Sequence, residues 1–203
     1  MPEIYTFTRA DKLASNCYAL FSGTEYCVID PSISLSEIKR ELNISEAPKF
    51  VLLTHEHLDH LWEVDSYVSE GVDILCSKEC AENIKNAKVN CSIWICGKEI
   101  AMDISCVIIQ DGDKISVGNE SISVLSTKGH SAGSFCYIGS GYCFTGDVLF
   151  AKGSYGRYDL PGGCAKELFS SIEALFQLDE NTVIYPGHGP TSEISQTKLF
   201  FKI

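Results

Sequence analysis

The chain has 203 residues, of which 45% are hydrophobic and 21% are charged, as in an ordinary globular protein with a substantial buried core. Its net charge of -11 argues against a nucleic-acid or anionic-membrane partner, because phosphate groups are bound by clustered Lys and Arg. We therefore expect no nucleic acid, no membrane and a small-molecule substrate. The length suits one domain, and we expect residues 1–203 to form it.

The first half of the chain starts with expected strands, which then alternate with helices. β-Branched and aromatic runs predict strands at 4–8, 17–21, 26–29 and 50–53. Apolar residues at helical spacing predict helices at 35–43, 62–69 and 78–87. Residues 72–106 match no motif, and they either shape a pocket rim or serve the structure alone.

The second half repeats this order of elements. Strands are expected at 106–109, 115–117, 122–125, 135–138, 142–144 and 182–185, with helices at 166–176 and 192–201. No apolar run of about 18 residues predicts a transmembrane helix. Two similar halves of strands and helices indicate an α/β fold with two sheets packed face to face and helices outside.

Ten cysteines require an interpretation. The N-terminus has neither a basic start nor an apolar stretch of signal-peptide length, so we expect a cytoplasmic protein with reduced cysteines. Several lie in expected strands, where a thiol packs as a small apolar side chain. The alternative is a structural metal site, although its spacings match zinc ribbons poorly; its ligands would be Cys76, Cys80, Cys91 and Cys96.

The most informative stretch is the pattern H-x-H-x-D-H at 55–60, directly after an expected buried strand. Strand ends are where a rigid scaffold presents side chains to a cleft. His55 and His57 point the same way if the chain is extended. Asp59 and His60 follow as the chain turns toward a helix, and they reach a neighbouring point. This arrangement suits two adjacent metal ions better than one.

The two remaining histidines, His130 and His188, occur in glycine-containing turns after expected strands, and Asp147 also follows a strand. Glycine permits the tight turns that aim an imidazole into a site. A lone histidine is usually a satisfied core or surface residue. Because all five histidines of the chain lie at strand ends, we predict a metal centre instead.

In chain order, H-x-H-x-D-H, G-H-S, G-D and G-H-G resemble the motif series of the metallo-β-lactamase superfamily, from about Cys17 to Pro190. The resemblance implies an αββα sandwich, with two mixed β-sheets flanked by helices and a metal cleft at one sheet edge. It implies a first metal ion held by His55, His57 and His130, a second held by Asp59, His60 and His188, and Asp147 bridging both. Two divalent ions, most simply zinc, suit these ligands, and iron or manganese tolerates them.

This ligand set predicts hydrolysis without a side-chain nucleophile. Two metal ions lower the pKa of a shared water (to about 7 for a zinc-bound water), which generates a bridging hydroxide, and they polarise the substrate carbonyl. Asp59 is the expected catalytic residue, because it binds metal and accepts a hydrogen bond that orients the hydroxide. Asp30 and Ser131 are candidates for orienting the ligands, with a purely local turn role as the alternative.

The loop at 146–163 and the start at 16–18 resemble the glyoxalase II-like branch of the superfamily. The resemblance implies a loop beside the cleft that contacts an acidic substrate such as a glutathione or other thiol conjugate, through Lys152, Tyr155, Arg157 and Tyr158. In the alternative, Arg157 and Asp159 pair with each other. Classical glyoxalase II continues into a helical C-terminal domain, whereas only residues 189–203 follow the last histidine here, so the short single-domain form fits better.

We therefore expect a binuclear hydrolase of a small thioester or ester, with hydroxyacylglutathione hydrolase activity included. Two other reactions fit the motifs. One is an iron-dependent persulfide dioxygenase, with a single iron held by His55, His57 and either Asp147 or His130. The other is a lactonase that opens cyclic esters.

Overall fold

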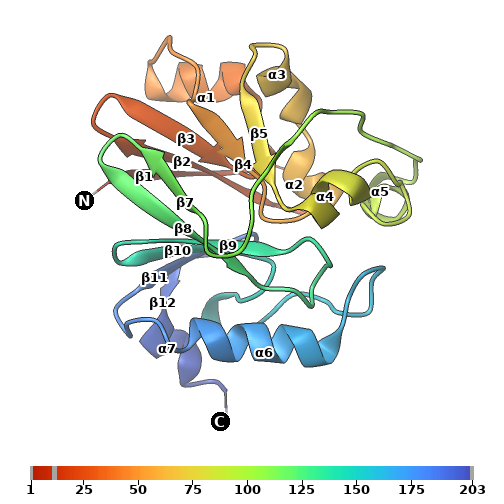
Figure 1. Cartoon of the computed structure of the whole chain (residues 1–203), viewed down its shortest axis with the longest axis vertical. Coiled ribbons are helices and arrows are strands. Elements are labelled where there is room, and N and C mark those ends of the chain that lie inside the picture. The colour runs from red at the N-terminus through yellow and green to blue at the C-terminus, as the bar shows by residue number, and fades with distance from the viewer. Residues whose placement is uncertain (1, 11–12, 202–203) are drawn as a thin grey trace.

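The computed structural model describes residues 2–10 and 13–201. Two six-stranded sheets lie face to face, with one layer of helices outside each sheet (Figure 1). This is the αββα arrangement that the sequence predicts.

The first sheet uses the N-terminal half of the chain. Its strands, in spatial order, are β1 (Glu3–Thr8), β2 (Asn16–Ser22), β3 (Glu25–Ile29), β4 (Phe50–Leu52), β5 (Asp73–Cys76) and β6 (Val107–Ile108). The first three strands pair antiparallel and β3 to β6 pair parallel, so the sheet is mixed. The helices of this half are α1 (Leu35–Leu42), α2 (Leu58–Leu61), α3 (Val64–Val68), α4 (Lys78–Asn83) and α5 (Ser92–Cys96).

The second sheet uses the C-terminal half. Its spatial order is β12 (Ser192–Glu193), β11 (Val183–Pro186), β10 (Tyr142–Gly146), β9 (Phe135–Gly139), β8 (Glu120–Ser126) and β7 (Lys114–Val117). Only β10 and β11 pair parallel. The 3-10 helix η1 (Ala151–Gly153) follows β10, and α6 (Ala165–Leu175) and α7 (Ile194–Lys198) cover the outer face (Figure 1).

Strand alternation divides the apolar residues between three layers. In β2, Tyr18 and Leu20 point between the sheets, while Cys17 and Ala19 pack beneath the helices of the first half. Tyr137 and Phe144 of the second sheet meet the first pair of side chains in the central layer. Each such side chain contributes roughly 1.5–3 kcal/mol through burial, so this central layer fixes how the two sheets face each other.

Four elements differ from the sequence prediction. β5 and α5 lie in the stretch 72–106, and the sequence analysis predicts neither of them. The helix expected at 78–87 ends at Asn83. The helix expected at 192–201 spans only 194–198, because Ser192 and Glu193 pair with β11 and complete the sheet edge.

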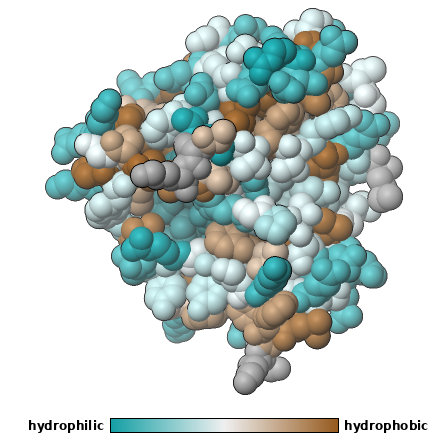
Figure 2. Space-filling model, turned by 180° about the vertical axis from the view of Figure 1, so that it is seen from behind, coloured by the Kyte–Doolittle hydropathy of each residue, from teal (hydrophilic) through white to brown (hydrophobic). Residues whose placement is uncertain are grey.

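On the face shown in Figure 2, exposed hydrophobic residues form separate small groups among hydrophilic ones. They do not form a continuous apolar area on this face. Within residues 2–10 and 13–201, no helix is long and apolar enough to span a bilayer.

Candidate metal centre

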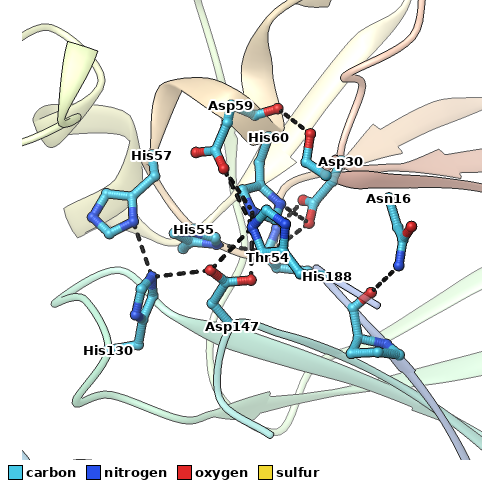
Figure 3. Close-up of polar contacts among 12 residues, drawn as sticks. Asn16, Asp30, Thr54, His55, His57, Asp59, His60, His130, Asp147 and His188 are labelled. Carbon is cyan, nitrogen blue, oxygen red and sulfur yellow. Dashed lines mark hydrogen bonds and ion pairs between the residues drawn. The ribbon is translucent and has the colours of Figure 1, made fainter. Parts of the chain in front are cut away.

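The predicted ligands converge at one edge of the sandwich, from both sheets (Figure 3). His55 and His57 follow β4, and Asp147 and His188 follow β10 and β11. Parallel neighbours place the carboxyl ends of their strands at the same edge, which explains how segments more than a hundred residues apart meet. His130 enters from the loop between β8 and β9.

The first ligand group is His55, His57 and His130, all buried, whose ligating atoms lie within 4.8 Å of one another. His130 Nδ1 donates to the carbonyl oxygen of Arg157 at 2.7 Å, so its Nε2 carries the lone pair. That Nε2 lies 2.9 Å from Nδ1 of His57. Two ring nitrogens therefore face each other as they would around a shared cation.

The second group is Asp59, His60 and His188, again within 4.8 Å. Nε2 of His188 lies 3.3 Å from Oδ2 of Asp59 and 3.3 Å from Nε2 of His60. The turn that carries His188 is held by Asn16, whose Nδ2 donates to the carbonyl oxygens of Pro186 and Gly189 at 3.0 and 2.9 Å. In the sequence, Asn16 is singled out only by the resemblance of residues 16–18 to the glyoxalase II-like branch.

Asp147 lies between the two groups. Its Oδ2 is 3.6 Å from Nε2 of His130 in the first group and 3.5 Å from Nε2 of His188 in the second. Its Oδ1 is 3.5 Å from Nε2 of His60. This is the position that a carboxylate bridging two metal ions needs.

The residues fit metal ions by an observation independent of the motif. Within residues 2–10 and 13–201, three buried side-chain atoms have no hydrogen-bond partner: Nε2 of His55, Nε2 of His57 and Oδ1 of Asp147. A buried unsatisfied polar atom costs about 1–3 kcal/mol. All three belong to predicted ligands. Divalent cations would satisfy Nε2 of His55 and Oδ1 of Asp147, whereas His57 faces the first ligand group through Nδ1. Imidazole and carboxylate donors suit zinc and iron alike.

The electrostatics of the two groups differ. Burial, helped by the neighbouring histidines, lowers the pKa of His57 to about 3 and that of His55 well below its usual range. These rings are neutral at pH 7, as metal ligands must be. Burial alone would lower the pKa of His60 and His188, but the surrounding carboxylates outweigh it and raise these values to about 9 and about 11.

The pKa of Asp147 shifts in the opposite direction to the pKa values of His60 and His188. Burial alone would raise its pKa, but the charges of His60 and His188 hold it well below its usual range. The second group and the bridge therefore form a negative pocket that holds protons in the absence of metal. A divalent cation would displace those protons.

Asp30 positions ligands from beneath. Its Oδ1 and Oδ2 accept hydrogen bonds of 2.7 Å from the backbone N and Oγ1 of Thr54, and Nδ1 of His60 lies 2.9 Å from Oδ2. Thr54 Oγ1 in turn faces Nδ1 of His55 at 3.0 Å. Asp30, His55 and His60 also lie close enough for a metal, but both oxygens of Asp30 already accept hydrogen bonds. It orients rings, as in carboxylate–histidine–metal arrangements.

Glu56 is a buried residue of the site that sequence reasoning missed. Its Oε2 accepts from Ser131 Oγ at 2.8 Å, and its Oε1 accepts from Asn83 Nδ2 at 2.9 Å. Ser131 therefore ties the loop of His130 to the segment of His57. The only signal in the sequence was the position of Glu56 between two ligands, which does not reveal its burial.

A cavity of about 320 Å³ opens onto the ligands and is lined by His57, Asp59, His130, Asp147 and His188. Of the residues predicted to contact substrate, Tyr155 and Arg157 line it. Lys152 is exposed and outside the lining, and Tyr158 packs toward Phe169, with ring centroids 6.5 Å apart. Arg157 Nε and Nη2 each donate to Asp159 at 2.9 Å, which is the internal pairing that the sequence left open.

The cysteines do not assemble a second metal site in the part of the chain described, where the groups able to hold an ion consist of His and Asp. Seven cysteines are buried. Cys91 lines the cavity, and burial raises the pKa of its thiol to about 12. It is therefore protonated near neutral pH and unsuited to act as a nucleophile.

Comparison with known proteins decides the family. A family model described as the metallo-beta-lactamase superfamily matches residues 10–79 and 93–188. The chain belongs to this superfamily.

Two relatives from Bacillus subtilis (strain 168) are similar over most of their length. The probable metallo-hydrolase YqgX is 32% identical over 188 residues, covering 90% of this chain and 88% of the relative. The probable polyketide biosynthesis zinc-dependent hydrolase PksB is 30% identical over 208 residues, covering 97% and 85%. Membership of this superfamily and these relatives support a metal-dependent hydrolase.

Solved structures show the same fold. The BLEG-1 B3 metallo-beta-lactamase superposes with a TM-score of 0.87 at 27% identity, covering 97% of this chain and 96% of that one. TTHA1623, in a di-iron-bound form, gives a TM-score of 0.82 at 27% identity, covering 96% of each chain. One metallo-β-lactamase-fold relative is thus named as zinc-dependent and another is seen with two irons.

Proposed function

We propose that this protein is a binuclear metal-dependent hydrolase of small thioesters or esters, with zinc as its most suitable metal. The observation that carries the proposal is the position of Asp147 between two complete ligand groups, with contacts of 3.5–3.6 Å to both. A single-metal site would need only one of these groups. The completeness of the second group therefore favours the hydrolase over a mononuclear iron dioxygenase.

The bound ions would supply an activated water and an electrophile for the substrate carbonyl. The first ion would be held by His55, His57 and His130, and the second by Asp59, His60 and His188. The protein's own contribution is a rigid, partly buried set of ligands beside an open cavity. Ring orientation is fixed by Asp30 at His60 and by the Arg157 carbonyl at His130.

Asp59 is the residue suited to orient the attacking water. It lines the cavity, and its Oδ2 contacts His60 and His188 at 3.6 and 3.3 Å. Burial alone would raise its pKa, but the charge of His60 outweighs it and the net pKa is lowered, so Asp59 is a carboxylate at neutral pH. A carboxylate at the cavity wall accepts a hydrogen bond from water.

The test is hydrolysis of S-lactoylglutathione, an acyl thioester and an aryl ester by purified zinc-loaded protein, beside an Asp59→Asn variant. We expect turnover of at least one substrate, a loss of more than a hundredfold in the variant, and two metal ions per native chain. If the protein with two bound ions turns over none of these substrates, the proposal is wrong. Equal activity of Asp59→Asn would remove the role assigned to Asp59.

A further inference from the structure

The cavity beside the candidate ligands also has an apolar wall. Besides the candidate ligands, its lining consists largely of apolar and aromatic side chains: Leu13, Trp94, Ile95, Phe150, Tyr155 and Leu160. The side chains of Trp94 and Tyr155 are 61% and 36% exposed. A large apolar surface beside a reactive centre indicates a binding site for an apolar group.

Trp94 and Ile95 belong to α5, and hydrogen bonds of buried Asn90 hold the segment around this helix. Buried Asn90 donates to the carbonyl oxygens of Ile84 and Ile100 at 2.9 and 2.8 Å, and its Oδ1 accepts from the backbone N of Ser92 at 3.0 Å. The backbone N of Leu58, the first residue of the ligand helix α2, donates to the Asn90 carbonyl at 2.9 Å. These bonds fix the Trp94 wall relative to Asp59 and His60.

The same cavity offers little to an anionic group. Arg157 is the one Lys or Arg in its described lining, and both carboxylate oxygens of Asp159 already occupy its guanidinium. A bidentate pair of this kind satisfies the guanidinium fork. A substrate that carries carboxylates, such as a glutathione conjugate, would have to share this guanidinium with Asp159 in a chain of net charge -11.

We infer that the cavity binds an uncharged, medium-length acyl chain against Trp94 and Ile95, which makes acyl thioesters or esters with an apolar acyl group the preferred substrates. This inference rests on the proposed hydrolase function and adds the substrate class. The scissile carbonyl would lie toward Asp59 and Asp147, and the chain would extend along α5. The preference follows from burial of methylene groups, so it grows with chain length until the wall is covered.

The first experiment measures kcat/KM of the zinc-loaded protein for N-acetylcysteamine thioesters with acetyl, butanoyl, hexanoyl and octanoyl groups. We expect an increase of up to about fourfold for each methylene buried, and S-lactoylglutathione below the hexanoyl thioester. Trp94→Ala should lower the ratio of the hexanoyl to the acetyl value by about tenfold. Phe200→Ala, another aromatic that is 61% exposed but lies outside the cavity lining, is the matched control.

A second experiment reports on binding without turnover. The chain has two tryptophans, so Trp62→Phe leaves Trp94 as the sole reporter. Titration of this variant with S-hexyl-N-acetylcysteamine, a thioether that cannot be hydrolysed, should change the Trp94 emission with saturation. The Kd should be at least about tenfold lower than for the S-methyl thioether.

The two failures are distinguishable. If neither the thioesters nor the aryl ester of the first test is hydrolysed, the proposed function fails, and saturable hexyl binding still supports the apolar site. If acetyl and hexanoyl thioesters are hydrolysed with equal kcat/KM and the hexyl thioether binds no more tightly than the methyl one, the hydrolase stands. The apolar acyl site is then wrong.

Discussion

Ser131 Oγ donates a hydrogen bond of 2.8 Å to Oε2 of Glu56, and both side chains are fully buried. Ser131 is next to the ligand His130, and Glu56 is next to the ligands His55 and His57. Because Glu56 also accepts from Asn83 in α4, one carboxylate joins three segments that meet at the first ligand group. The bond therefore sets the separation between His57 and His130.

Glu56→Ala should destabilise the protein by about 1–3 kcal/mol, because it leaves the buried donor groups of Ser131 and Asn83 without an acceptor. Glu56→Gln should cost much less, since its amide oxygen still accepts from Asn83 and the Ser131 hydroxyl can accept from the new amide. Urea unfolding of the metal-free proteins measures both effects, with exposed Glu82→Gln as the control. Equal losses for Ala and Gln would show that the negative charge, rather than these hydrogen bonds, is required.

Asp30→Asn should weaken metal binding by about 10–100-fold, the usual effect of removing a group that orients a ligating histidine. An amide can replace only part of the set of acceptors that holds Thr54 and His60. Competition with a chromogenic chelator measures the affinity, and Asp103→Asn, at a side chain 99% exposed, is the control. Unchanged metal affinity would mean that Asp30 has only the local turn role.

The convergence of the candidate ligands was predictable from sequence because they occur in short patterns of fixed spacing that follow β4, β8, β10 and β11. The αββα layering was predictable because strand alternation in β2 and β3 supplies apolar residues to both faces. Neither prediction depends on a distant partner. β5 was missed because its apolar run is only three residues long, and its strand character comes from pairing between β4 and β6.

What the sequence could not give depends on partners far along the chain. The burial of Glu56 requires Ser131, 75 residues later. The cavity role of Trp94 emerges only when α5 packs against α2. Lys152 follows Asp147 closely in sequence but lies outside the cavity lining, because its backbone adopts φ +57° in η1.

Asp147→Ala should reduce metal content from two ions per chain to one or none, because this carboxylate contacts both ligand groups. Elemental analysis after dialysis against zinc measures the content. Asp113→Ala, in an exposed turn, should keep two ions. Two tightly held ions in Asp147→Ala would contradict the bridging position.

Native protein should react with iodoacetamide at no more than three cysteines, Cys96, Cys106 and Cys164, whereas unfolded protein reacts at all ten. The attacking species is the thiolate. Burial raises the pKa of Cys17 to about 12, so such thiols stay protonated as well as shielded when the pH rises from 7 to 9. Intact-mass measurement counts the adducts. Rapid native labelling of seven or more sites would contradict the packing of these cysteines.

Gly187→Ala should disrupt the metal centre more than any neighbouring glycine substitution. A Cβ there would lie 2.1 Å from Oδ1 of Asp147 and 2.6 Å from Cε1 of His60, so the bridge and a ligand must both move. Gly189→Ala is the matched control in the same turn: its φ of +77° costs about 1–2 kcal/mol, but nothing lies within 4 Å. We expect Gly187→Ala to lose metal and Gly189→Ala to lose only stability, as measured by zinc content and thermal unfolding. Equal zinc content in both variants would contradict close approach to Asp147 as the reason for glycine at position 187.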